Sequence, residues 1–149
     1  MTLLDVRDLT VEFPLTGGSI RPVDGVSFAV EKGEILALVG ESGCGKSLTA
    51  LALLQLVPRP GRVAGGSVRL GELEVTSLQG EALRAVRGRR IGMVFQDPLT
   101  SLNPVLTVGS QVAEGLVAHG MMGKAEAARR AVELLKEVGV ADAEERANA

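Results

Sequence analysis

The residues best suited to chemistry form one glycine-rich stretch, Gly40-Glu41-Ser42-Gly43-Cys44-Gly45-Lys46-Ser47. It fits the pattern G-x-x-x-x-G-K-[ST], whose glycines let backbone N–H groups close around phosphate oxygens. In that chemistry Lys46 reaches the β- and γ-phosphates, Ser47 offers its hydroxyl to Mg²⁺, and a helix start faces the anion. A plain turn between a strand and a helix would not need this lysine and hydroxyl. The sequence therefore predicts a phosphate site formed by Gly40, Glu41, Ser42, Gly43, Cys44, Gly45, Lys46, Ser47 and Leu48.

The segments on either side of this loop must hold it in place. Ile35–Val39 is apolar at every position, which is typical of a central parallel strand covered on both faces. We expect it to be the core strand of a three-layer sheet. Good helix formers with almost no charge follow from Lys46 to Val57, until Pro58 stops them. This helix should be nearly buried.

Further apolar patterns predict the remaining elements of the first part of the chain. Leu3–Phe13 alternates loosely and predicts a half-buried strand that Pro14 ends. The other predicted elements are a strand at Val26–Val30, an antiparallel pair within Val63–Val75, a short helix at Ser77–Val86 and a second buried strand at Ile91–Phe95.

Helices dominate after Pro104. Thr107 is a predicted N-cap for a helix that carries apolar residues at Val108, Val112, Leu116 and Val117. A second helix runs from about Ala128 until Gly139 stops it. Its charged residues, Glu126 with Arg129 and Arg130 and Glu133 with Lys136, predict an exposed, charge-paired face.

The composition narrows the function classes. The chain has 149 residues, 46% of them hydrophobic, with a net charge of -2, no Tyr or Trp and three Phe, which argues against nucleic-acid binding. No apolar run is long enough to span a bilayer, and the N-terminus lacks a signal-peptide pattern. With one cysteine, Cys44, a cytosolic or peripheral membrane location is expected. One interpretation is that oxidation of Cys44 switches off phosphate binding by the loop. The interpretation that fits better is that Cys44 is a small side chain and that its neighbours bind the phosphate.

Two polar features of the sequence are better explained as solvated or capping residues than as functional sites. The basic turn Arg87-Gly88-Arg89-Arg90 is interpreted as solvated, because it is short and has no aromatic neighbours. His119 is interpreted as a solvated or capping residue at a helix end.

Taken together, the residues resemble the first half of the ATP-binding subunit of an ABC transporter. Gly40–Ser47 alone indicates only the P-loop NTPases. Gln96, at the end of an apolar strand, is similar to the Q-loop glutamine of that family. Val94-Phe95-Gln96-Asp97-Pro98 and Thr100-Ser101-Leu102-Asn103-Pro104 resemble the dipeptide and oligopeptide importer branch. The resemblance extends from Leu3 to about Ala147.

This resemblance implies an α/β fold, a P-loop NTPase αβ core with an antiparallel β subdomain, followed by a mostly helical subdomain and incomplete at its C-terminus. Residues 1–96 would form the nucleotide-binding core and residues 97–149 the start of the helical subdomain. The implied cofactors are ATP and Mg²⁺, with Ser47 and Gln96 meeting the metal. The adenine would stack near Ile20 and Arg21, with Phe13 as the aromatic residue upstream.

The resemblance also implies partners. Such subunits pair head to tail, as homodimers or heterodimers, on the cytoplasmic face of a membrane. The segment Asp97–Leu106 would meet a membrane permease. Nothing after Gln96 matches the LSGGQ motif, the Walker B aspartate, the catalytic glutamate or the switch histidine. We therefore expect a fragment with little or no hydrolysis, whose core strand keeps an open edge and favours aggregation.

Other functions stay open. A small self-contained P-loop kinase or GTPase would use Ile91–Phe95 as its Walker B strand and Asp97 as its Mg²⁺ ligand. The segment after Asp97 fits a Q-loop better. A non-catalytic module would bind nucleotide or a permease without turnover. A soluble ABC ATPase of DNA repair or translation fits less well, because the chain lacks a basic face.

Overall fold

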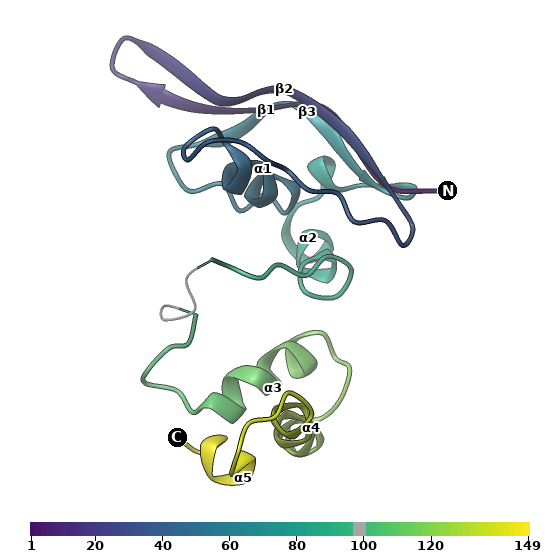
Figure 1. Ribbon diagram of the computed structural model, residues 1–149, viewed down its shortest axis with the longest axis vertical. Coiled ribbons are helices and arrows are strands. Elements are labelled where there is room, and N and C mark those ends of the chain that lie inside the picture. Colours follow the sequence, from purple (N-terminus) through teal and green to yellow (C-terminus); the bar gives the residue numbers. More distant parts are fainter. Residues whose placement is uncertain (97–100) are drawn as a thin grey trace. The chain divides into compact units, whose positions relative to one another are not determined.

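The computed structural model describes residues 1–96 and 101–149, and these form two compact units, Met1–Arg87 and Gly88–Ala149. The first unit holds all the strands that the structure describes, and the second holds α3, α4 and α5 (Figure 1). The alternative metal ligand Asp97 lies outside the described residues.

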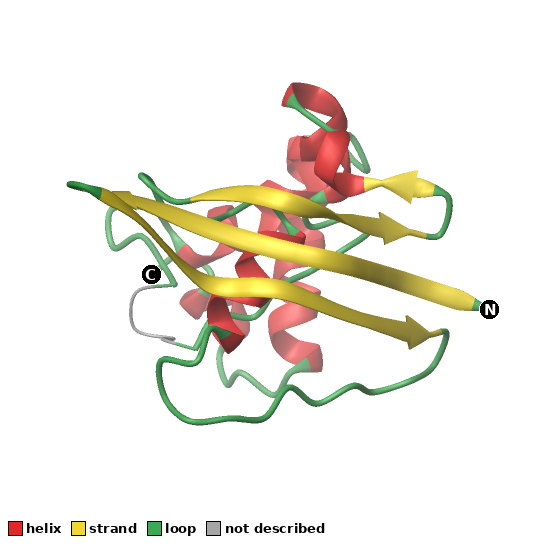
Figure 2. Cartoon of the chain, turned by 90° about the horizontal axis from the view of Figure 1, so that it is seen from above, coloured by secondary structure: helices red, strands yellow, loops and turns green. Residues whose placement is uncertain are grey.

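The first unit is built on an antiparallel sheet of four strands in the order β2-β1-β3-β4 (Figure 2). The strands are β1 (Thr2–Leu15), β2 (Gly18–Glu31), β3 (Arg62–Leu70) and β4 (Leu73–Glu74). The central strands bury Val6, Leu9, Val11 and Val68, and the alternation of buried side chains along β1 is interrupted by a shift in register between Val6 and Leu9. The predicted strand at Leu3–Phe13 and the antiparallel pair within Val63–Val75 are confirmed, although β1 continues through Pro14 to the hairpin end.

Two predicted buried strands are wrong. Ile35–Val39 has no strand hydrogen bonding, and Ile35 and Val39 are 95% and 89% exposed. Ile91 forms only an isolated bridge, and the segment that follows leaves Val94 and Phe95 exposed. The physical reason is the same in both places. An apolar segment becomes a buried strand only when neighbouring strands pair with it, and the four strands of the described sheet pair with one another instead.

Short helices complete the first unit: α1 (Lys46–Leu53), the 3₁₀ turn η1 (Val75–Ser77) and α2 (Gly80–Val86). The predicted helix after the loop is therefore present but shorter than expected. Only Thr49 and Ala52 are buried within α1, so the helix is less enclosed than its composition predicted. It lies against one face of the sheet, near β1 and β2 (Figure 1).

The second unit contains α3 (Val108–Ala118), α4 (Lys124–Glu137) and the short α5 (Ala143–Arg146). The predicted N-cap is confirmed, because the Thr107 side chain accepts a hydrogen bond from the Ser110 backbone N–H. Small residues let α3 and α4 pack closely around Ala113, Ala127 and Ala131. The charged face of α4 is present with other partners than predicted, since Arg130 pairs with Glu133 and Glu137, and Lys136 pairs with Glu144.

Candidate phosphate-binding site

The glycine-rich loop closes against β2. Gly43 and Gly45 adopt positive φ angles of 83° and 95°, which glycine tolerates without a steric penalty. A Cβ atom on Gly45 would lie 2.5 Å from the backbone oxygen of Pro22 and 3.4 Å from the Val23 side chain. Only glycine therefore allows this close approach, and the contact fixes the start of α1 beside strand β2.

The ammonium group of Lys46 lies within the loop. Its Nζ atom donates hydrogen bonds to the carbonyl oxygens of Gly40 at 2.8 Å and Glu41 at 2.7 Å. The Cys44 sulfur is 3.5 Å away, and this cysteine is exposed. The loop thus wraps around a positive charge, which is the arrangement that an anionic phosphate would meet.

The first turn of α1 adds backbone donors to the same place. Gly45 caps the helix without a side-chain bond, and its carbonyl accepts hydrogen bonds from the backbone N–H and the hydroxyl of Thr49, at 2.8 and 2.9 Å. The first N–H groups of a helix have no partner within the helix, so those of Lys46, Ser47 and Leu48 are available to bind an anion. Ser47, the second residue of this turn, is exposed.

The three adenine candidates lie on β1 and β2, next to the loop contact at Pro22. Phe13 and Ile20 are cross-strand partners, and the Phe13 ring packs on Gly61. Arg21 is paired instead with Glu12, at 3.3 Å. Phe13 and Ile20 therefore lie together, whereas the Arg21 guanidinium is paired with the Glu12 carboxylate.

Glu12 joins three strands of the sheet. Its carboxylate accepts a hydrogen bond from Arg62 on β3 at 3.1 Å as well as the one from Arg21 on β2. These two guanidinium groups, that of Arg62 first, hold the pKa of Glu12 below its usual range. Glu12 is therefore a structural tie between the strands.

The predicted metal ligands Ser47 and Gln96 belong to different units, and Gln96 is exposed in a bend. The roles of both residues stay predictions. Across residues 1–96 and 101–149, no group of three or more His, Cys, Asp or Glu residues could hold a metal ion.

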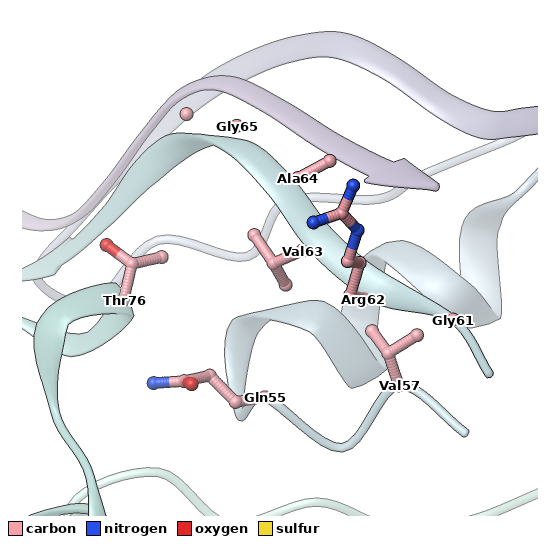
Figure 3. Close-up of a pocket in the computed structure, with 9 residues that line it drawn as sticks. Gln55, Val57, Gly61, Arg62, Val63, Ala64, Gly65 and Thr76 are labelled. Carbon is pink, nitrogen blue, oxygen red and sulfur yellow. The ribbon is translucent and has the colours of Figure 1, made fainter. Parts of the chain in front are cut away.

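A cavity of about 440 Å³ lies at the other end of α1 from the loop. Figure 3 shows Gln55 and Val57, from the segment after α1, facing residues of β3 across this cavity. None of the predicted phosphate-binding residues lines it. The cavity is therefore separate from the candidate site.

One side chain was misread from the sequence. Arg87, interpreted as part of a solvated turn, is half-buried, and its guanidinium donates to the backbone oxygens of Leu54 and Gln55, at 2.9 and 2.8 Å. These carbonyls belong to the end of α1. No local pattern links residues so distant in the sequence, so this contact could not be predicted from it.

The fold is that of an ATP-binding cassette. The chain resembles the solved structure titled "Dimeric structure of a post-hydrolysis state of the ATP-binding cassette MJ0796 bound to ADP and Pi", with a TM-score of 0.76. The match covers 97% of this chain and 60% of the other, at 24% sequence identity. Residues 23–149 match the family model described as ABC transporter, and the chain belongs to this family.

Curated relatives include peptide transport proteins. The chain is 48% identical, over 98% of its length, to "Probable peptide ABC transporter ATP-binding protein y4tR" of Sinorhizobium fredii, and it covers 44% of that protein. It is 45% identical, again over 98% of its length, to "Oligopeptide transport ATP-binding protein OppD" of Bacillus subtilis, of which it covers 41%. The chain thus spans less than half the length of these relatives. Among the residues that the structure describes, no helix combines the length and hydrophobicity needed to cross a membrane.

Proposed function

We propose that this chain binds ATP through Gly40–Leu48, as part of the ATP-binding subunit of an ABC transporter that imports peptides or similar solutes. The observation that carries the proposal is the loop wrapped around the Lys46 ammonium, at the start of a helix. The names of the relatives support the peptide branch.

Each part of the loop has a distinct task in this proposal. The Lys46 ammonium leaves its carbonyl partners and pairs with the β- and γ-phosphates, and the backbone N–H groups of the first turn hold the phosphate oxygens. Mg²⁺ suits the site, because it prefers oxygen ligands and takes only one or two from the protein. Ser47 would supply a hydroxyl and Gln96 a side-chain oxygen, and the bound ion would neutralise phosphate charge.

We assign binding rather than turnover to this chain. Phosphoryl transfer also needs a group that orients the attacking water. The predicted site contains no residue assigned to that task. In the proposed assembly, a second ATP-binding subunit completes the site.

The permease would meet the segment that follows Gln96, on the cytoplasmic face of the membrane. Leu102, Val105 and Leu106 expose apolar side chains there. A groove of about 490 Å³, bordered by Leu106 and by residues of α3 and α4, begins at the same place. An apolar helix or loop of a permease subunit fits this surface.

Titration of the chain with MgATP tests the proposal. Lys46→Ala should weaken binding at least tenfold, because it removes the one cation that lies inside the loop. Lys32→Ala removes the same charge from an exposed turn and should leave the dissociation constant unchanged. Equal affinities of the original chain and the Lys46→Ala variant would refute the assignment.

A further inference from the structure

Helix α1 ends in a turn that normally calls for glycine. Gln55, two residues after Leu53, has a positive φ of 52°. The Leu56 N–H donates to the Leu51 oxygen at 2.9 Å, and the Gln55 N–H donates to the Ala52 oxygen at 3.0 Å. These two bonds define a Schellman motif, in which the residue with positive φ is usually glycine.

The two longer helices, α3 and α4, end in the same motif with glycine in that position. Gly120 follows α3 with φ of 62°, and Gly139 follows α4 with φ of 80°. The hydrogen bonds Met121 N–H to Leu116 oxygen and Val140 N–H to Leu135 oxygen correspond to the bond made by Leu56. A residue with a Cβ atom is disfavoured in this conformation, so the glutamine of α1 requires another reason.

The Gln55 side chain supplies that reason. Its Nε2 atom donates to the backbone oxygen of Val75 at 2.7 Å and to that of Leu78 at 3.1 Å. Val75 is fully buried in the turn η1. A glycine at position 55 would keep the turn and lose both of these bonds, which tie the end of α1 to the segment after β4.

Arg87 completes the connection from the other side. Its guanidinium donates to the carbonyl oxygens of Leu54 and Gln55, the two residues that follow α1. The cation also lies at the negative end of the helix dipole. The neighbouring α2 is anchored by the buried side chains of Leu83 and Val86. The backbone of Arg87, directly after this helix, is therefore held in place.

Both ends of α1 are thus held from outside the helix. Gly45 rests on Pro22 at the start, and the Gln55 and Arg87 side chains hold the end. A helix of eight residues is too short to be stable alone. Its position therefore depends on these contacts, and the phosphate-binding N–H groups at its start depend on its position.

We propose that Arg87, together with Gln55, is a positioning residue for phosphate binding: it holds the far end of α1 so that the loop keeps its geometry. This inference rests on the proposed ATP binding. Neither residue touches nucleotide, and both act through the helix.

Hydrogen exchange of the chain without nucleotide tests the first step. Arg87→Ala should speed exchange of the backbone N–H groups of residues 49–56 and leave those of β1 and β3 protected. Arg84→Ala is the matched control, because it removes an exposed guanidinium from the adjacent helix α2. Equal exchange of α1 in the two variants would overturn the proposal.

MgATP titration tests the second step. Arg87→Ala should weaken binding about five- to tenfold, and Arg87→Lys should restore part of the loss, because lysine keeps the charge but makes fewer bonds. Arg84→Ala should bind as the original chain does. If Arg87→Ala speeds exchange without weakening binding, its role is structural only and the positioning role is refuted.

A further variant covers the case in which Arg87→Ala does not fold. Gln55→Gly keeps the left-handed turn and removes only the side-chain amide. It should also weaken MgATP binding and speed exchange, whereas unchanged or tighter binding would overturn the proposal. If the original chain and Lys46→Ala bind equally, the proposed function fails and the positioning role fails with it. The exchange experiment still shows separately whether Arg87 holds α1.

Discussion

Strand β1, which alternates loosely between apolar and polar residues, and the fully apolar segment Ile35–Val39 differ in how far their apolar side chains are buried. In β1, Leu9 and Val11 are fully buried, while Ile35 and Val39 are almost fully exposed. Strand β1 pairs with β2 on one side and β3 on the other. Ile35–Val39 pairs with none of the strands that the structure describes. Hydrophobic sequence alone therefore does not decide burial, because burial also requires neighbours.

The difference also separates stability from function. The paired sheet holds five of the six largest fully buried side chains, Val6, Leu9, Val11, Val23 and Val68, whereas the unpaired segment leads directly into the phosphate loop. The loop is held in place by β2 through Gly45 and by the contacts at the end of α1. The paired sheet should therefore carry the stability of this unit.

The same substitution in both regions should give the largest difference. Val11→Asp places a charge among fully buried side chains and should lower the free energy of unfolding by several kcal/mol, about 4 or more. Val39→Asp, at a site that is 89% exposed, should change it by at most about 0.5 kcal/mol. Urea denaturation followed by circular dichroism measures both. Similar losses in the two variants would contradict the account, since Val39 would then be buried in solution.

A smaller effect should appear in self-association. The exposed apolar surface of Ile35–Val39 should make the chain associate as its concentration rises. The double variant Ile35→Asp and Val39→Asp should shift sedimentation profiles toward the monomer. A double variant on the polar face of α4, Glu126→Gln with Arg129→Gln, serves as the control. A chain that is already a cooperatively melting monomer at high concentration would speak against this surface as the cause.

Local signals in the sequence predicted a large part of the fold. The alternation in β1, the Thr107 cap of α3 and Gly139 after α4 each depend on neighbouring residues, and the structure has all three. The strands predicted at Ile35–Val39 and Ile91–Phe95 failed, because their burial depends on distant partners. Such partners leave no trace in a five-residue pattern.

The candidate site, like the fold, could be predicted only where its signals are local in the sequence. The glycines, Lys46 and Ser47 carry their chemistry in their types and spacing, so the loop could be found without a structure. The contact of Gly45 with Pro22 and the bonds of Arg87 to the end of α1 join segments far apart in the sequence. Arg87 was misinterpreted for that reason. In sequence, an arginine in a solvated turn cannot be distinguished from one that binds the end of a distant helix.

The location of bound nucleotide tests the central claim most directly. A ¹⁵N-labelled chain titrated with MgATP should show its largest backbone amide shifts at Gly43, Gly45, Lys46 and Ser47. Gly65 and Gly66, which line the separate cavity, should stay unchanged. Shifts at Gly65 and Gly66 without shifts in the loop, or no shifts at millimolar MgATP, would contradict the claim that Gly40–Leu48 binds the phosphates.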